Sequence, residues 1–216
     1  MRTYLGPIGF NPTSITRPIL SYGLDDGDVV TLVRPEDEMD DRRAEETLAD
    51  VDRTLGALEP DVTTNVERVP HDDFSTAVLA CRDLIDGAVG DCILVLGGGA
   101  RDVLIPLTVA GLAASRCISR TLTYSDIDGA VREIQLPNLT ASIPRQSRKT
   151  LAIIGAEESI ALPEIAEKAG YSKSTVTRHV NQLSDKAAVE TWMEGRSKVV
   201  KITTTGRLLL KAQTEP

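Results

Sequence analysis

LVLGGGAR, residues 94–101, is an apolar run that passes through three glycines into the start of a helix. The apolar residues begin at Cys92 and continue unbroken to Leu96, as expected of a strand buried on both faces of a parallel sheet. Beyond the glycines, residues 103–114 are mostly apolar and long enough to form a helix. A buried strand that enters a helix through glycines is typical of the α/β class.

Strand and helix signals alternate around this stretch. The spacing of apolar residues predicts strands at 3–5, 28–33 and 62–69, and helices at 15–22, 48–58 and 74–88. The last helix has an apolar stripe that runs from Phe74 to Ala88. Residues 118–124 and 130–136 flank a turn at 125–129 of the kind that joins antiparallel strands. The sequence therefore predicts a Rossmann-like domain, a parallel sheet with helices on both faces and a terminal antiparallel hairpin.

The C-terminal part predicts a second domain. Helices are expected at residues 151–154 and 162–169, after which Gly170 supplies a sharp turn. Ser172 is a good N-cap for a third helix, whose inward positions are Val176, Val180 and Leu183. A hairpin at 189–202, with its tip at 195–197, and a closing helix at 205–210 follow. We expect a first domain at 1–137, a linker at 138–144 and a winged helix-turn-helix at 145–216.

The outward face of the third helix is polar and basic. Such side chains reach phosphates and base edges in the major groove of double-stranded DNA. The basic hairpin tip, the wing, suits the adjacent backbone or minor groove. The predicted DNA-binding residues are Ser172, Lys173, Ser174, Thr175, Thr177, Arg178 and Gln182 in the helix, and Arg196 and Lys198 in the wing. A helix-turn-helix that serves protein contacts is the alternative, and His179 is better explained as structural than as a base contact.

The distribution of charge supports a DNA partner although the net charge is −8. Residues 1–140 carry 24 acidic and 12 basic side chains, whereas residues 141–216 carry 8 and 12, so the two parts have net charges of −12 and +4. No lysine precedes Lys149, and aspartate is frequent. This composition resembles the acidic surface of proteins from salt-loving organisms, and we expect a haloarchaeal source.

Metal, redox and membrane functions are not expected. Cys81, Cys92 and Cys117 are odd in number, lack C-x-x-C spacing and lie among apolar residues, which predicts buried reduced thiols. The two histidines, His71 and His179, are far apart in sequence, so no metal site or cofactor is predicted. No stretch approaches the roughly 20 apolar residues that span a bilayer, and a signal-peptide pattern is absent. We expect a cytoplasmic protein.

The glycine-rich turn predicts an anion site. A strand that ends in glycines at a helix N-terminus presents backbone N–H groups and a helix dipole to an anion, with phosphate the natural candidate. The dinucleotide-binding fingerprint G-x-G-x-x-G is not met, because Asp102 occupies the position of its third glycine. A second loop, at 6–11, lies on the same edge if the first and fourth strands are adjacent, so the two loops frame one crevice. The alternative is a turn that needs glycine for packing alone. Phe10 suits stacking on a base and a hydrophobic staple equally well.

Two resemblances sharpen these expectations. Residues 172–180, SKSTVTRHV, resemble the winged helix-turn-helix domains of prokaryotic regulators, which implies DNA binding. The six-strand domain, the turn after its fourth strand and the C-terminal winged helix together resemble the CRISPR-associated CARF regulators. That resemblance implies a homodimer with a small nucleotide ligand, a cyclic oligoadenylate, across its interface. The residues matched to the ligand site are Gly9, Phe10, Asn11, Gly97, Gly98, Gly99, Ala100 and Arg101.

The function expected is therefore a ligand-responsive transcription regulator of CRISPR–Cas genes. The turn departs from the commoner family pattern, which has a hydroxyl residue and then a basic residue after two glycines, because Gly99 and Ala100 precede Arg101. No catalytic residues are predicted, since nucleophile, base and metal cluster are missing. Two alternatives stay open. One is a ring nuclease or other Rossmann enzyme with a DNA-binding tail, and the other is a constitutive DNA-binding dimer or a sensor of another small molecule.

Overall fold

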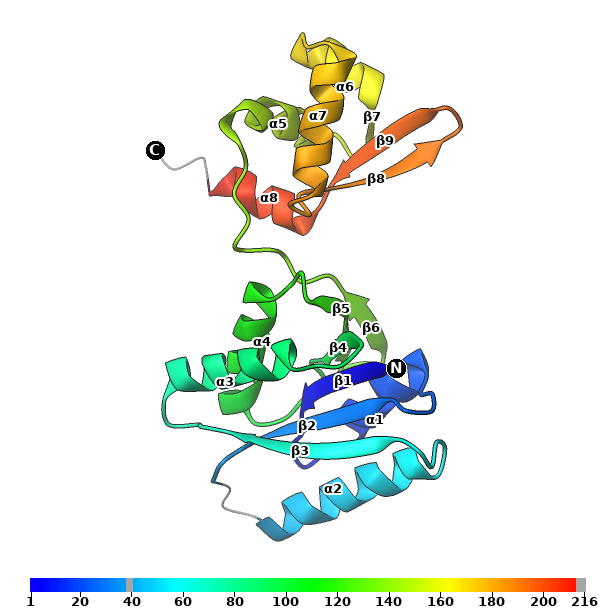
Figure 1. Ribbon diagram of the computed structural model, residues 1–216, viewed down its shortest axis with the longest axis vertical. Helices are drawn as coiled ribbons and strands as arrows, with labels where there is room; N and C mark the ends of the chain where they lie inside the picture. Colours follow the sequence, from blue (N-terminus) through cyan, green and yellow to red (C-terminus); the bar gives the residue numbers. More distant parts are fainter. Residues whose placement is uncertain (38–40, 213–216) are drawn as a thin grey trace. The chain divides into compact units, whose positions relative to one another are not determined.

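The computed structural model describes residues 1–37 and 41–212, which divide into two compact units (Figure 1). The first is Met1–Leu136 and the second is Pro137–Pro216. The first unit alternates strands and helices, and the second consists of short helices and a small sheet. The predicted fold class, a Rossmann-like domain followed by a winged helix-turn-helix, is confirmed.

A six-stranded sheet forms the first unit, in the order β3-β2-β1-β4-β5-β6. All neighbours are parallel except β5 and β6. The strand order reverses between β1 and β4, which makes this pair the switch point of the sheet. The strands are β1 (Arg2–Pro7), β2 (Val29–Pro35), β3 (Thr63–Val69), β4 (Asp91–Val95), β5 (Ile118–Tyr124) and β6 (Val131–Ile134), and the helices are α1 (Thr13–Tyr22), α2 (Asp41–Gly56), α3 (Phe74–Asp86) and α4 (Arg101–Ala113).

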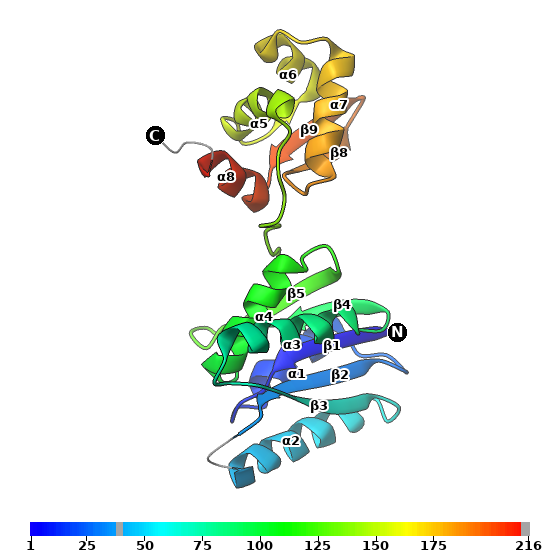
Figure 2. The ribbon, with the colours of Figure 1, turned by 60° about the vertical axis from the view of Figure 1, so that its left-hand side comes forward.

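Helices cover both faces of this sheet, as the two views in Figures 1 and 2 show. Tyr4 and Ile93 pack with α1 and α2 on one face, and the next residue of each strand, Leu5 and Leu94, packs with α3 and α4 on the other. This alternation follows from the two-residue period of a strand. Each fully buried Leu or Ile stabilises the unit by about 1.5–3 kcal/mol, so both faces contribute to the core.

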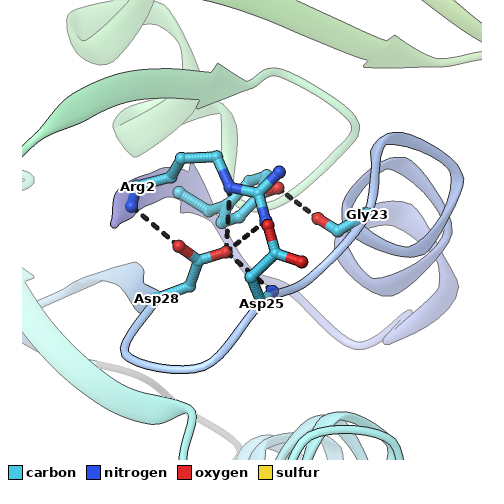
Figure 3. A network of polar contacts seen from close by, with 5 residues as sticks. Arg2, Gly23, Asp25 and Asp28 are labelled. Carbon is cyan, nitrogen blue, oxygen red and sulfur yellow. Dashed lines mark hydrogen bonds and ion pairs between the residues drawn. The ribbon is translucent and has the colours of Figure 1, made fainter.

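The amino end of the sheet is fixed by ion pairs around a buried carboxylate (Figure 3). Asp28 Oδ1 accepts from the backbone N–H of Arg2 at 2.7 Å, and Asp28 Oδ2 accepts from Arg2 Nε at 2.9 Å and from the backbone N–H of Asp25 at 3.0 Å. Arg2 Nη2 also bonds Asp25 at 2.6 Å, and the Tyr4 hydroxyl donates to the carbonyl of Gly23. These bonds tie the start of β1 to the turn before β2, at the edge opposite the glycine-rich turn.

The second unit is a three-helix core with a three-stranded sheet in the order β7-β9-β8. The hairpin of β8 and β9 extends beyond the helices (Figure 1). Gly170, with φ of 71°, ends the second helix in the left-handed region, where glycine is favoured. The elements are the 3₁₀ turn η1 (Arg145–Ser147), α5 (Arg148–Gly155), β7 (Ile160–Ala161), α6 (Leu162–Ala169), α7 (Lys173–Ser184), β8 (Val189–Glu194), β9 (Ser197–Ile202) and α8 (Thr204–Lys211).

Several details differ from the sequence expectations. Cys117 is exposed, so the prediction of three buried thiols holds only for Cys81 and Cys92. Phe74 is the first residue of α3, after the N-cap Asp73, and its side chain is exposed rather than part of the buried stripe. β7 was not predicted, because two residues are too short to show a period. The expected linker packs with the second unit, where Ile143 joins the core and the backbone N–H of Asn138 donates to Thr205 Oγ1 at 2.9 Å.

Candidate ligand pocket and nucleic-acid interface

A pocket of about 380 Å³ lies where the loops that follow β1 and β4 meet. Parallel strands place their carboxyl ends at one edge of the sheet, and the crevice beyond a switch point is the usual ligand site of such sheets. The two loops are therefore neighbours although their strands, β1 and β4, are far apart in the chain. The pocket is lined by Gly9, Phe10, Asn11, Ser14, Gly97, Gly98, Gly99, Ala100 and Asp126.

The glycines allow the two loops to pack on each other. A Cβ on Gly97 would lie 2.0 Å from the carbonyl oxygen of Ser14, and one on Gly98 would lie 2.8 Å from Ser14 Oγ. Gly99 has a φ of 96° and would place a Cβ 2.7 Å from the Pro7 Cβ. Real Cβ atoms do not approach other atoms so closely, so each glycine is needed for packing. The same glycines are therefore required for packing and also line the pocket, so the need for close packing does not exclude a ligand site.

The glycine-rich turn leaves backbone donors at the pocket. Within the described residues, the N–H groups of Gly98, Gly99 and Ala100 donate to no protein acceptor. Ala100 is the N-cap of α4 and provides no side-chain oxygen for the helix start. Buried or half-buried N–H groups are normally hydrogen-bonded, so this wall of the pocket suits a ligand that brings its own acceptors.

Two lining residues were missed by the sequence analysis. Ser14 lies in the first turn of α1, and its Oγ donates to the carbonyl of Asn11 at 2.8 Å. Asp126 lies in the turn between β5 and β6. The signal for Asp126 was available, because β5 is the neighbour of β4 and the residues after its carboxyl end lie at the same edge of the sheet. No sequence pattern predicts Ser14 at the pocket, because its position there depends on how α1 packs against the glycine-rich turn.

Seven of the eight predicted ligand residues line the pocket, and Arg101 does not. Arg101 is the first residue of α4 and is exposed. Phe10 is 43% exposed, and the guanidinium carbon of Arg43 lies 4.6 Å from its ring centroid. One face of the Phe10 ring is therefore covered by a cation, which is a favourable contact with the ring quadrupole.

The predicted recognition helix is α7. Its N-cap Ser172 accepts a hydrogen bond from the backbone N–H of Thr175 at 3.3 Å, which orients the first turn. The side chains of Lys173, Ser174, Thr177 and Arg178 are exposed, and Thr175 is half-buried. Gln182 is half-buried, and its Oε1 accepts a hydrogen bond from Ser147 Oγ at 3.0 Å. Ser172 and Gln182 therefore have structural partners, and Arg178 is the basic residue in the middle of the exposed face.

Hydrogen bonds hold basic segments on two flanks of α7. On one flank, Lys198 Nζ of the wing donates to Asn181 Oδ1 at 3.4 Å, while Arg196 is exposed at the hairpin tip. On the other flank, Thr150 Oγ1 of α5 lies 2.9 Å from Nδ1 of His179. Three residues, Asn181, Arg145 and Arg148, were absent from the predicted interface and are exposed. The basic cluster before α5 was the available signal for the two arginines.

His179 belongs to the core of the second unit. It is 3% exposed and its ring meets the Tyr171 ring edge-on at 5.6 Å between centroids. Burial, together with the charge of Arg178, lowers the pKa of His179. The imidazole is therefore neutral at physiological pH, and it supports α7 from behind rather than from the exposed face.

Two further properties concern metals and membranes. Within residues 1–37 and 41–212, no group of three or more His, Cys, Asp and Glu side chains is arranged to hold a metal ion. No helix in the described part of the chain has the length and apolar character needed to cross a bilayer.

The solved structures that are similar to this chain match about a third of its residues. Similar chains include a mutant of MarR from E. coli complexed with operator DNA, at 24% identity and a TM-score of 0.31, covering 33% of this chain and 53% of that chain. MepR from S. aureus in a DNA complex has 23% identity and a TM-score of 0.32, with coverages of 33% and 62%. PcaV from Streptomyces coelicolor has 18% identity and a TM-score of 0.31, with coverages of 32% and 50%. The match spans about half the length of these structures.

Comparison with protein families covers both units. No curated protein matched the chain. The model of the winged helix-turn-helix DNA-binding family matches residues 144–186, from η1 to just beyond α7. The model of the Csa3 CRISPR-associated Rossmann-like domain matches residues 2–149, which contain the whole six-stranded sheet and the pocket. The chain therefore belongs to the family of the Csa3 CRISPR-associated Rossmann-like domain, here followed by a winged helix-turn-helix.

Proposed function

We propose that this protein is a homodimeric transcription regulator of CRISPR–Cas genes that senses a cyclic oligoadenylate and binds double-stranded DNA through its winged helices. The observation that carries the proposal is the pocket at the switch point of the sheet, in a chain of a CRISPR-associated family that also has a DNA-binding fold. A symmetric ring nucleotide suits a two-fold dimer, because equivalent parts of the ring can meet equivalent pockets.

The turn at 97–100 supports a ligand with phosphate groups. Among the described residues, the N–H groups of residues 98–100 have no protein acceptor. Helix α4 begins immediately after them, so the positive end of its dipole adds to the same wall. Arg101 is exposed beside this wall and is available to a part of the ligand that extends out of the pocket. We therefore assign phosphate to the turn, with Arg101 as an outer contact.

The exposed face of α7 and the wing support DNA binding. Lys173, Ser174, Thr175, Thr177 and Arg178 supply the groove contacts in this proposal, and Arg196 and Lys198 supply backbone contacts. A dimer holds two such heads, and tethering raises the effective concentration of the second head once the first has bound. Ligand binding then regulates DNA affinity by changing how the dimer presents the two heads. The acidic, lysine-poor first unit supports a salt-loving archaeal source, so the assays include molar KCl.

A thermal-shift panel of cyclic tri-, tetra- and hexaadenylate, with AMP and NAD as controls, tests the ligand. A ligand that binds only the native state stabilises it by about 2.7 kcal/mol at a concentration 100 times its Kd, which is a readily measured shift. DNA affinity is then measured by fluorescence anisotropy with and without the active ring. Arg101→Ala is expected to weaken ring binding with little change in melting temperature, because its side chain is exposed.

The outcomes separate the alternatives. DNA binding without a shift from any adenylate would favour the constitutive dimer or a sensor of another molecule. Recovery of a linear product from the ring would favour the ring nuclease, for which Ser14 is a hydroxyl at the pocket. Equal ring affinity in wild type and Arg101→Ala would remove Arg101 from the site and leave the pocket assignment in place.

A further inference from the structure

The charge of the pocket does not match a site that binds phosphate alone. Among the described residues that line it, Asp126 is the one with an ionisable side chain, and it is negative. Within the described part of the chain, its carboxylate forms no hydrogen bond or ion pair. An unpartnered carboxylate that faced only phosphate would oppose binding. The pocket therefore has two kinds of wall, one that donates hydrogen bonds and one that accepts them.

The remaining polar side chains divide in the same way. Asn11 Oδ1 already accepts from the backbone N–H of Thr13 at 3.0 Å, which leaves the side-chain amide N–H groups as donors. Ser14 Oγ uses its proton on the carbonyl of Asn11, which leaves the oxygen as an acceptor. The donors are thus Asn11 and the glycine-rich turn, and the acceptors are Ser14 and Asp126. A ligand that fills this pocket needs both acceptor oxygens and neutral hydrogen-bond donors.

We propose that Asp126 accepts a hydrogen bond from a ribose hydroxyl of the bound nucleotide, and so makes the pocket selective for ribonucleotides over deoxyribonucleotides. This inference rests on the proposed function and specifies one part of the ligand. An ionised carboxylate is an acceptor only, and its hydrogen bonds with hydroxyl groups are stronger than those between neutral groups. A nucleotide at neutral pH offers only uncharged donor groups to such an acceptor, and a ribose hydroxyl is one of them.

The position of Asp126 favours the sugar over the base. It lines the same small pocket as the turn to which phosphate is assigned, and in a nucleotide the ribose is the group bonded directly to phosphate. A volume of about 380 Å³ is near the lower limit for ligand pockets, so it holds about one nucleoside of a larger ring. Phe10, an aromatic ring on the loop after β1, is the candidate neighbour of the base.

The test compares two proteins with two ligands by calorimetry on the full chain. The proteins are wild type and Asp126→Asn, and the ligands are the cyclic oligoadenylate selected by the thermal-shift panel and its 2′-deoxy counterpart. Asp126→Asn is expected to weaken binding of the ribose ring about tenfold or more, the loss typical of a hydrogen bond to a charged group. The deoxy ring should bind wild type more weakly by a similar factor, and both proteins should bind the deoxy ring equally.

A matched control separates the hydrogen bond from long-range charge. Asp52→Asn removes the same charge from an exposed position on α2 that does not line the pocket, and it should leave both affinities unchanged. Melting temperatures of both variants should match wild type, because neither carboxylate has a partner to lose within the described residues.

Three results would overturn the inference. Tighter binding of the ribose ring by Asp126→Asn would mean that the carboxylate only repels phosphate. An equal loss on both rings would show that Asp126 does not contact the 2′-hydroxyl. A loss that persists on the deoxy ring and vanishes on a cyclic oligoinosinate, which lacks the adenine amine, would assign Asp126 to the base. Failure of the proposed function is a different result, in which wild type binds no cyclic adenylate.

Discussion

Asp28 shows how single residues fix the edge of the sheet far from the pocket. Its side chain is buried, and burial by itself raises the pKa of a carboxyl group. Hydrogen bonds from the Arg2 side chain and from the backbone N–H groups of Asp25 and Arg2 outweigh this effect, and the pKa of Asp28 lies below its ordinary value. The ionised form is therefore the one that the folded state stabilises.

Replacing this carboxylate tests that conclusion. Asp28→Asn should lower the free energy of unfolding by about 2–4 kcal/mol at pH 7, because it leaves Arg2 without its buried partner. Because the pKa is lowered in the folded state, the stabilisation is complete above the unfolded pKa of about 4 and is lost as the pH falls through the folded value. Calorimetric melting should therefore show that wild type and variant converge below about pH 4.

Asp26→Asn is the matched control, since Asp26 is an exposed carboxylate in the same turn. Its melting temperature should stay within experimental error of wild type. A difference between wild type and Asp28→Asn that stayed constant from neutral to strongly acidic pH would show that the effect is steric and does not involve the charge.

At the scale of elements, the second unit combines three segments around α7. The wing contacts α7 through Lys198 and Asn181, and α5 contacts it through Thr150 and His179. Basic side chains on both flanks of a recognition helix suit the two phosphate backbones that border a major groove. In the proposed complex with DNA, the helix supplies the base contacts, and the flanks set its position on the duplex.

These two roles predict different effects of mutation. Arg178→Ala should weaken binding to the preferred operator by about 1–3 kcal/mol and relax sequence specificity, because the side chain is assigned to a base edge. We assign Arg148, an exposed residue on the α5 flank, to a phosphate contact. Arg148→Ala should therefore weaken binding to all sequences alike and reduce the slope of log affinity against log salt by about 1. Fluorescence anisotropy on specific and random duplexes at several KCl concentrations measures both quantities.

Arg207→Ala is the control for this comparison. Arg207 is exposed on α8, a helix that packs against α5 and β9, and its loss changes the charge of the unit by the same amount. Its salt slope should remain that of wild type. If Arg148→Ala and Arg207→Ala behaved alike, the flank formed by η1 and α5 would not belong to the interface.

At the scale of the whole molecule, α4 is the element that suits a dimer contact. Ile105 is 52% exposed and Val109 is 37% exposed one turn later, on a helix whose other face is already buried in the core. Apolar positions on both sides of a helix suit an outer side that a second partner covers, so we propose α4 as the dimer contact. Because α4 begins just after the glycine-rich turn, a contact through this helix would couple ligand binding directly to the dimer.

Sedimentation velocity tests this assignment. The unit Met1–Leu136 should dimerise, whereas the unit Pro137–Pro216 should be mainly monomeric and bind DNA weakly. In the full chain, Ile105→Glu should shift the protein toward monomer and weaken DNA binding through the loss of tethering. A dimeric C-terminal fragment beside a monomeric N-terminal one would place the dimer contact in the winged helix instead.

The sequence by itself determined the fold class and the order of the elements, apart from the two-residue strand β7 and the 3₁₀ turn η1. The apolar run Cys92–Val95 is buried on both faces of the sheet, and the apolar residues of α3 and α7 recur at helical spacing. The local sequence pattern was therefore sufficient to predict these elements. The sequence also located the two glycine loops. Three successive glycines directly after a buried strand predict a tight turn into a helix, and the loop after β1 was expected at the same edge of the sheet. Phe74 was wrongly included in the buried stripe of α3. It is the first residue of the helix, directly after the N-cap Asp73, and helical spacing alone does not show where the helix begins.

Only the tertiary structure decided which residues outside the two glycine loops line the pocket. The packing of α1 against the glycine-rich turn brings Ser14 to Gly97 and Gly98, and the pairing of β5 beside β4 brings Asp126 to the same edge. Arg101 follows the same turn but lies outside the pocket lining, because the helix that starts there carries its side chain into solvent. The spacing of apolar residues in the sequence shows which face of a single helix or strand is buried. A site is formed by side chains from several elements, and their meeting depends on packing that no local period records.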